Sequence, residues 1–231
     1  MKGKTVFIIQ SCYIPWKGFF DALNRADECI LFDDMQYSKD HWHNRNQIQT
    51  IDGLKWLTIP VFGKKNIGQK IRDVQIDGNK WREKHWNSIK HSYGRSQYFN
   101  EYSPVIKSIY QDKVSASLSE MNHAFILAIN GILGITTKIK WSHDLEIIEG
   151  KNERIIHLMQ QLDATNILAG PSAKSFVKED QFNNAGLNVE WLDYSNYPTY
   201  NQLFNPFVHE VSILDLIFNE GPNAKKYLKS F

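Results

Sequence analysis

The chain has 231 residues, 42% of them hydrophobic, and a formal net charge of +2 at pH 7. This length suits one domain, or one domain with a small elaboration, and the hydrophobic content supports a sizeable core and argues against disorder. A net charge this small indicates no polyanionic partner by itself.

Targeting signals are not evident in the sequence. The N-terminal stretch "MKGKTVFIIQ" has lysines before a short apolar run, but no small-residue cleavage site follows, so we interpret it as a first strand rather than a signal peptide. No apolar run reaches the roughly 18–20 residues that span a bilayer. Cys12 and Cys29 form no metal or redox spacing motif, and so few cysteines fit a reducing compartment. We therefore expect a cytoplasmic protein.

The start of the chain has the pattern of a βαβ unit. Residues 5–9, "TVFII", are apolar at consecutive positions, as in a strand covered on both faces, and residues 18–26 carry apolar side chains at helical spacing. Residues 28–34, "ECILFDD", predict a second buried strand that ends in two carboxylates. This order predicts a parallel sheet. Residues 56–62 predict a further strand, with Pro60 at an edge or at the strand's end.

The apolar period becomes helical from about residue 80 to 133. Four residues of this region share one helical stripe: Trp81, His85, Ile89 and Ser92. Residues 118–135 predict a more apolar core helix.

Strands and helices then alternate again. The predicted strands are 137–142, 166–170 and 188–194, and the predicted helices are 152–164, 173–186 and 211–221, the last two each closed by glycine. The sequence therefore predicts an α/β fold with a mostly parallel sheet, flanking helices and a helical insertion around 80–133.

Charge is unevenly distributed along the chain. Residues 39–95 contain twelve basic and five acidic side chains, an excess of +7. Such a region suits a phosphate-bearing ligand or nucleic acid, and a solvated charged surface is the alternative.

Three groups of polar side chains follow predicted parallel strands. They are Gln10 to Gly18 after the first strand, Asp33-Asp34 at the end of the second, and residues 170–172 after the strand at 166–170. Because ligands of open parallel sheets lie at the carboxyl ends of strands, we expect the three groups to converge on one crevice.

The first group has the composition of a ring- or sugar-binding turn. Gln10, Tyr13 and Trp16 offer stacking surfaces and hydrogen bonds, and Gly18 lets a ligand or a neighbouring backbone approach closely. Core packing of the two rings and a tight turn at the glycine are the alternative.

The second group offers acid–base chemistry. Successive side chains on a strand point in opposite directions, so one of Asp33 and Asp34 is expected to face the crevice. A carboxylate partly removed from water has a raised pKa and can take a proton near neutral pH. Asn44, Arg45 and Asn46 follow with two amides and a guanidinium, which suit a diphosphate or a carboxylate, and a structural Arg–Asp pair is the alternative.

Metal binding and thiol chemistry are weakly indicated. His41 and His43 would share a face in a strand, but no third ligand stands at a recognised spacing, so no metal is predicted. Cys12 is near the first turn, but no histidine pairing is visible from sequence.

The third group and the C-terminal stretch complete the candidate site. Gly170, Pro171 and Ser172 open a predicted helix and form either an anion site or a plain helix cap. The polar aromatic stretch 193–221 indicates a lid or ring-binding loop, or packing alone, and its candidate binding residues are Tyr197, Tyr200 and Gln202.

These blocks, in this order, resemble the WbqC-like family of bacterial O-antigen gene clusters. The matching stretches are "QSCYIPWKGFFD", "DDMQYSKDHWHNRNQI", "WLTIPV", "LAGPSAKSF", "YPTYNQLFNPF" and "VSILDLIFNEG". They extend from about residue 6 to 221, so the resemblance implies a single WbqC-like domain over residues 1–231.

The resemblance implies a glycine transferase that acylates the amine of a nucleotide-linked amino sugar. Such a reaction needs a base, for which Asp33 or Asp34 is the first candidate and His43 the second, and a donor to the developing oxyanion, for which Asn44, Arg45 or backbone N–H groups near Ser172 are candidates. The diphosphate would be bound by basic side chains, with four candidates: Lys17, Lys39, Arg45 and Lys174.

The sequence does not determine the identity of the acyl donor. Glycine with ATP, a charged tRNA and an acyl thioester are the candidate sources of an activated glycyl or acyl group. Two alternatives from other function classes are an acyl-CoA-dependent sugar N-acyltransferase and a non-catalytic partner that binds a sugar nucleotide.

Overall fold

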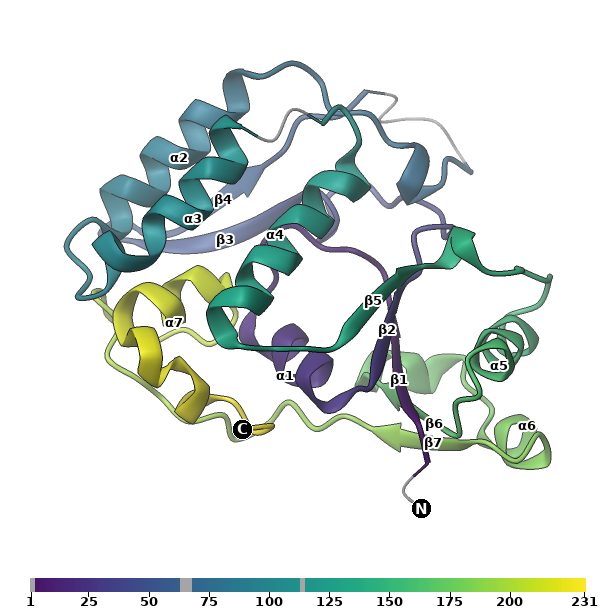
Figure 1. Cartoon of the computed structure of the whole chain (residues 1–231). Coiled ribbons are helices and arrows are strands. Elements are labelled where there is room, and N and C mark those ends of the chain that lie inside the picture. Colours follow the sequence, from purple (N-terminus) through teal and green to yellow (C-terminus); the bar gives the residue numbers. More distant parts are fainter. Residues whose placement is uncertain (1–2, 63–67, 113–114) are drawn as a thin grey trace.

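A parallel sheet forms the centre of the protein. The computed structural model describes residues 3–62, 68–112 and 115–231, and among them five strands pair in the order β5-β2-β1-β6-β7 (Figure 1). The strands are β1 (Thr5–Ile9), β2 (Glu28–Leu31), β5 (Lys138–Trp141), β6 (Asn166–Ala169) and β7 (Asn188–Trp191), and all neighbours are parallel. The predicted α/β fold with a mostly parallel sheet is confirmed.

The predicted βαβ unit is β1, α1 (Lys17–Arg25) and β2. β1 is apolar at consecutive positions because both of its faces are covered. Phe7 packs into the core that contains α1 and α4 side chains, and Val6 packs into a second core under α5 and α6. The alternation of a strand therefore sends neighbouring residues into two different cores.

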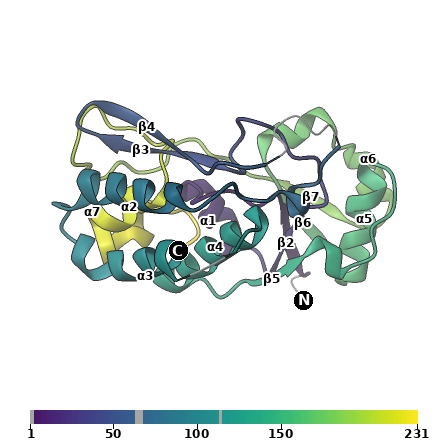
Figure 2. The same ribbon diagram turned by 90° about the horizontal axis from the view of Figure 1, so that it is seen from above.

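A second lobe packs against α1. It contains α2 (Lys80–Tyr93), α3 (Phe99–Gln111), α4 (Leu118–Leu133), α7 (Ile213–Glu220) and the antiparallel hairpin of β3 (Arg45–Thr50) and β4 (Gly53–Thr58). The predicted stripe on α2 is buried against this lobe's core. Figure 2 shows the hairpin on one side of α2, with the sheet between this lobe and α5 and α6. The predicted helical insertion is confirmed.

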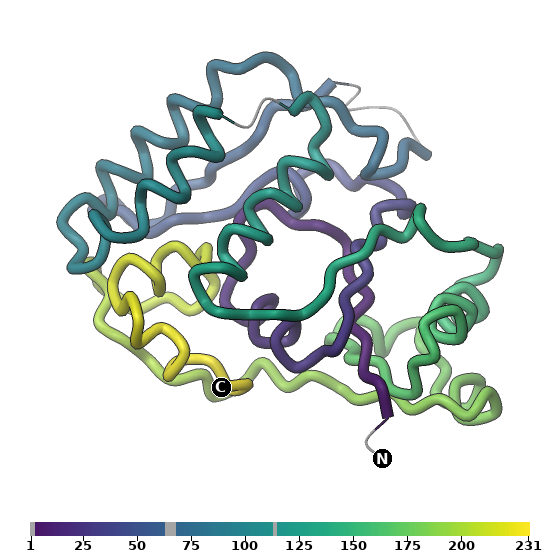
Figure 3. Tube along the Cα trace, viewed as in Figure 1, coloured from purple at the N-terminus to yellow at the C-terminus, as the bar shows by residue number. Residues whose placement is uncertain are grey.

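α5 (Asn152–Gln161) and α6 (Glu179–Asn184) cover the other face of the sheet. In the trace of Figure 3, the N-terminal strand β1 lies beside β6, which follows it by more than 150 residues in the chain. No helix among the described residues is long and apolar enough to cross a membrane. Lys64 and Lys65, counted in the basic segment, lie outside the described residues.

The hairpin differs from the prediction. β3 was not predicted, because its sequence "RNQIQT" contains one apolar residue, Ile48, and the inward-facing Asn46 is polar. β4 ends at Thr58 rather than at residue 62, and Pro60 follows the strand's end, as its lack of a backbone donor favours.

Two further differences from the prediction concern residues of the candidate site. The predicted helix 173–186 is a short 3₁₀ helix, Pro171–Ser175, followed by α6, because the Asn152 amide donates to the carbonyl of Phe176 (3.1 Å) and accepts from the N–H of Lys178 (3.1 Å). β2 ends at Leu31, so Asp33 and Asp34 lie in the turn after the strand rather than on it.

Candidate functional site

The strand order creates a switch point between β1 and β6. The chain leaves β1 toward β2 on one side, and it later returns to β6 on the other side, so loops depart from these two strands in opposite directions. In open α/β sheets, ligands bind in the crevice outside the carboxyl ends of such strands. Two cavities lie at this edge of the sheet.

The first cavity, called the aromatic compartment below, has a volume of about 510 Å³. Half of its fourteen lining residues have aromatic rings. Its wall consists of Phe7, Ile9, Gln10, Cys12, Pro15, Trp16, Phe19, His41, Trp42, His43, Asn46, Ser172, Tyr194 and Glu210. The Trp16 and Tyr194 rings meet edge to face, with centroids 5.2 Å apart. Such a wall suits a sugar or another polar ring.

The second cavity, called the aliphatic compartment below, has a volume of about 760 Å³. Its wall consists of Phe7, Ile8, Ile9, Gln10, Phe32, Met35, Gly150, Lys151, Arg154, Ile155, Ile167, Leu168, Ala169, Gly170, Ser172, Ala173, Phe176, Val177 and Tyr194. The two compartments share five residues, namely Phe7, Ile9, Gln10, Ser172 and Tyr194. They are therefore two parts of one crevice.

His43 is the best-placed titratable ring in the aromatic compartment. Its Nδ1 lies 3.1 Å from the Ser11 carbonyl oxygen, which can only accept, so Nδ1 carries the proton and Nε2 has a free lone pair. Burial lowers the pKa of His43 to about 4, so the ring is neutral at pH 7. The His41 ring lies beside it, with centroids 4.8 Å apart.

A buried network fixes the backbone that holds His43. The Asp33 carboxylate, 0% exposed, accepts from the Ser11 N–H (2.7 Å) and the Ser119 hydroxyl. The Asn122 amide of α4 donates to the Ser11 hydroxyl (3.1 Å) and the His43 carbonyl (2.8 Å). Burial raises the pKa of Asp33 in spite of these hydrogen bonds. Asp33 lines neither compartment, and it contacts Ser11, whose carbonyl oxygen accepts from His43.

Asp34 belongs to the scaffold as well. Its carboxylate accepts from the Ser142 hydroxyl (2.7 Å) and forms ion pairs with Lys70 (3.1 Å) and Arg72 (2.8 Å). Burial alone would raise the pKa of Asp34, but the Ser142 and Lys70 hydrogen bonds and the Arg72 charge outweigh it and lower that pKa. Asp33 and Asp34, predicted as candidate bases, are both among the described residues, and neither lines the crevice.

The first turn divides between crevice and core. Gln10 and Trp16 line the crevice. The side-chain amide of Gln10 makes no hydrogen bond within the described part of the chain, whereas its backbone carbonyl accepts from Cys12 Sγ. A Cβ on Gly18 would lie 2.3 Å from the Trp16 ring, so this glycine makes room for that ring rather than for a ligand. Tyr13 is 0% exposed, and its hydroxyl pairs with His85 Nδ1 (2.9 Å) in the core.

The "NRN" segment also has mostly internal partners. The Asn44 amide donates to the Ile59 carbonyl (2.9 Å), and the Asn46 amide donates to two carbonyls of the first turn. Asn46 lines the aromatic compartment, whereas Asn44 and Arg45 do not. The Arg45 guanidinium lies 4.2 Å from the centroid of the Trp56 ring and 3.4 Å from Asp40.

Gly170 and Ser172 line the crevice, as their place after β6 predicts. Pro171 and Lys174 are exposed and line neither compartment, and Lys174 lies 5.4 Å from the centroid of the Trp191 ring. Lys39 is exposed and pairs with its neighbour Asp40 at 3.7 Å.

The C-terminal stretch folds inward against α1. The Lys17 ammonium donates to the Pro198 carbonyl (3.1 Å) and lies 5.0 Å and 5.3 Å from the ring centroids of Tyr197 and Tyr200. Burial lowers the pKa of Lys17 to about 8, against the charges of nearby carboxylates. Gln202 exchanges two hydrogen bonds with the Val208 backbone, each 2.8 Å long. These residues pack inside the protein rather than forming an open lid.

Asp21 joins the same segment to the chain's last residues. Its carboxylate accepts from the Tyr197 hydroxyl (2.6 Å) and from the N–H groups of Lys229 and Ser230, both at 2.8 Å. α1, which carries part of the crevice wall, is therefore held by residues from the C-terminal part of the chain.

Several wall residues were not predicted from sequence. Arg154 and Lys151 belong to the start of α5, and Glu210 precedes α7. The position of α5 gives a signal that could have identified Arg154, because a helix that follows a parallel strand begins at the carboxyl edge of the sheet. Trp42 is 42% exposed at the aromatic compartment, and its ring lies tilted against that of Trp56, with centroids 5.5 Å apart. Nothing in the sequence distinguishes it from a core tryptophan.

Thiol and metal chemistry receive little structural support. Cys12 lines the aromatic compartment, but burial, followed by the charge of Asp33, raises the pKa of its thiol to about 12. Among the described residues, no cluster of three or more histidine, cysteine, aspartate or glutamate side chains could bind a metal ion.

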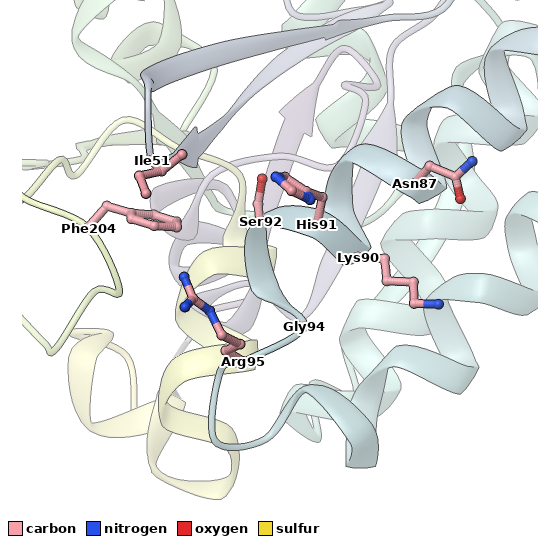
Figure 4. A pocket seen from close by; sticks show the side chains of 8 residues that line it. All are labelled: Ile51, Asn87, Lys90, His91, Ser92, Gly94, Arg95 and Phe204. Carbon is pink, nitrogen blue, oxygen red and sulfur yellow. The ribbon is translucent and has the colours of Figure 1, made fainter.

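A third hollow lies away from this edge of the sheet, between the end of α2, the hairpin turn and the C-terminal stretch (Figure 4). Its volume is about 640 Å³, and its wall includes Lys90, His91 and Arg95 from the basic segment. Of the described residues, none lines both this hollow and the crevice.

Comparison with known proteins places most of the chain in one family. Residues 10–227 match the model of the WbqC-like protein family. A relative from Mycobacterium tuberculosis (strain ATCC 25618 / H37Rv), named "Uncharacterized protein Rv1507c", is 44% identical over 226 residues, which cover 98% of each chain. No solved structure matches significantly.

Proposed function

Because the chain belongs to the WbqC-like protein family, we propose that it forms an amide on an amino sugar. In this proposal an activated glycyl group is transferred to the amine of a nucleotide-linked amino-deoxy sugar during synthesis of O-antigen or another surface polysaccharide. The observation that supports it best is the pair of compartments with different walls that meet at Gln10 and Ser172. A group transfer needs two ligands whose reacting ends meet in this way.

The aromatic compartment suits the acceptor. The rings of Trp16, Trp42 and Tyr194 offer faces and edges on which a sugar ring can pack. Glu210 places a carboxylate in the same wall, which would attract the ammonium form of the sugar amine.

His43 is the proposed general base. The bound ammonium first releases one proton to solvent, because only the free amine can attack. The amine then attacks the acyl carbonyl, and the nitrogen of the tetrahedral adduct loses a second proton to His43 Nε2. A base whose pKa is about 4 takes only an acidic proton, and the proton on the adduct's positively charged nitrogen is of that kind. Collapse of the adduct breaks the bond to the donor's oxygen or sulfur, and the leaving group takes up the proton.

Gln10 is the proposed donor to the oxyanion. It lies at the junction of the compartments, and its amide has no other hydrogen bond within the described residues. A donor of this kind stabilises the transition state by about 3–4 kcal/mol. Of the candidates from the sequence, Asn44 already donates to the Ile59 carbonyl, and the Arg45 guanidinium lies against the Trp56 ring and Asp40.

An acyl-CoA-dependent sugar N-acyltransferase is the second candidate function. The size of the aliphatic compartment favours it, because about 760 Å³ is far more space than a glycyl group fills. Both candidates use the same acceptor, base and oxyanion donor.

An end-point assay by mass spectrometry tests the proposal. The acceptor is a nucleotide-linked 4-amino-4,6-dideoxy sugar, and parallel reactions contain glycine with ATP, glycyl-tRNA, or an acyl-CoA. We expect an acyl mass gain in one reaction that is lost with His43→Gln. Absence of any gain, while the sugar nucleotide still binds, would contradict catalysis and favour a non-catalytic sugar-nucleotide-binding role.

A further inference from the structure

We propose that the aliphatic compartment binds an aliphatic acyl thioester on a phosphate-bearing carrier, such as an acyl-coenzyme A. This inference rests on the second candidate function, the acyl-CoA-dependent sugar N-acyltransferase, and replaces the glycyl donor of the first with a defined class of donor. The donor would place its acyl chain against the apolar wall and its thioester at the junction with the aromatic compartment. A glycyl donor would leave most of this wall without a partner.

The wall favours a flexible aliphatic chain over a flat ring. Nine of its nineteen lining residues are aliphatic or methionine, and they come from strand ends, from α5 and from the segment after β6. A nucleobase needs polar partners for its edges, which this part of the wall offers sparsely. Phe176 is 40% exposed on this wall, so its ring is open to a chain bound in the compartment.

Two cations lie on the same wall. The Arg154 guanidinium is oriented by a hydrogen bond from Nε to the Ile148 carbonyl (2.8 Å) and by the Met35 sulfur, 3.6 Å from Nη1. Within the described residues no carboxylate forms an ion pair with Arg154 or Lys151. Lys151 is exposed beside this guanidinium. An oriented, unneutralised guanidinium with a lysine beside it, next to an apolar wall, suits an amphiphile with a phosphate.

The reaction balances with this donor. The amine nitrogen forms a bond to the thioester carbonyl carbon, and the carbon–sulfur bond breaks. The proton lost by nitrogen passes through His43 to the departing thiolate, so the products are the sugar amide and the free thiol. No oxidant, reductant or nucleotide hydrolysis is needed.

Calorimetric titration of the full chain tests the assignment. The probes are coenzyme A, acetyl-CoA, butyryl-CoA, octanoyl-CoA and ATP. We expect affinity to rise with chain length, by roughly threefold per added methylene while the chain stays within the wall. Equal affinity for coenzyme A and octanoyl-CoA, or preferential binding of ATP, would overturn the proposal.

Three variants locate the bound donor. Ala173→Trp fills the aliphatic compartment and should weaken octanoyl-CoA binding at least tenfold. Phe176→Ala should reduce the dependence of thioester affinity on chain length, and it should leave the protein folded because the position is exposed. Arg154→Gln should weaken all thioesters similarly, whereas the control Arg25→Gln, at the far end of α1, should not. Unchanged chain-length dependence in a folded Phe176→Ala protein would overturn the proposal.

A separate titration with the sugar nucleotide distinguishes this inference from the proposed function. If the protein binds the sugar nucleotide but binds none of the thioesters, the inference is overturned and a glycyl donor stays in place. Chain-length-dependent binding of thioesters without binding or turnover of an amino sugar would support the inference and contradict the proposed acceptor.

Discussion

The aromatic and aliphatic compartments share five wall residues and one sheet edge, yet their remaining walls come from different parts of the chain. The first turn and residues 41–46 build the aromatic wall, and residues 150–155 and 167–177 build most of the aliphatic wall. The sheet thus supplies a common floor, and the segments on either side of the switch point set the chemistry. Changes in one wall should therefore alter one ligand and spare the other.

The largest effect is expected from His43. His43→Gln removes the proposed base while keeping a donor near the Ser11 carbonyl, so turnover should fall about 100- to 10,000-fold with little change in donor binding. Single-turnover kinetics with saturating ligands measure this. Turnover within threefold of wild type would remove His43 from the mechanism.

The junction between the compartments should respond nearly as strongly. Gln10→Ala should lower the rate of acyl transfer about 100- to 1,000-fold, because the oxyanion loses its proposed donor. Binding of each ligand alone should change far less than the rate. Gln97→Ala removes a glutamine from the helical lobe and is the matched control, since Gln97 lines neither compartment.

Acid should destabilise the protein through its buried neutral histidines. Burial lowers the pKa of both His43 and His85 to about 4, whereas an unfolded histidine has a pKa of about 6.5. Between these values the unfolded chain binds more protons, so the stability present above pH 6.5 is lost as the pH falls toward 4. The loss is roughly 2–3 kcal/mol per histidine by pH 4.5.

Urea unfolding at pH 7 and pH 4.5 measures this loss. His43→Gln should lose less stability on acidification than wild type, and the control His91→Gln, which replaces an exposed histidine, should lose as much as wild type. An equal loss in all three proteins would contradict the buried neutral state of His43.

Gly18 tests the construction of the aromatic wall. Gly18→Ala should displace the Trp16 ring and cost about 1–3 kcal/mol of stability, because the new Cβ would lie 2.3 Å from that ring. Urea unfolding measures the stability, and titration with each ligand shows which wall has moved. Donor binding should be preserved, and weaker binding of both ligands alike would contradict the separation of the walls.

The smallest effect is expected at the rim. Trp42→Ala should weaken sugar-nucleotide binding by about 0.5–1.5 kcal/mol, the contribution of one stacking ring, and should leave thioester binding unchanged. Isothermal titration measures both. Leu54→Ala removes an exposed apolar side chain from the neighbouring hairpin and is the control, because Leu54 lines neither compartment.

Local patterns were sufficient to predict the sheet and the edge at which its crevice lies. "TVFII" and the two apolar stretches after it predicted β1, α1 and β2. The rule for strand ends predicted that Gln10 and Ser172 line one crevice. β3 was missed because most of its residues are polar, although several are buried.

The individual roles in the site depend on partners distant in sequence. Asp33 is bound by Ser119, Asp34 is paired with Lys70 and Arg72, and neither carboxylate lines a compartment. Nothing near Gly18 in the sequence indicates whether a ligand or the Trp16 ring occupies the space beside it. Such roles are set by tertiary contacts, which local sequence patterns do not specify.

The hydrogen bonds to Asp21 have a consequence for synthesis on the ribosome. α1 is made within the first 25 residues, but three of the donors that hold it are the Tyr197 hydroxyl and the N–H groups of Lys229 and Ser230. A nascent chain therefore cannot complete the contacts of α1 until Lys229 and Ser230 have been translated. During that time the crevice wall is incomplete, and its apolar residues are open to chaperones.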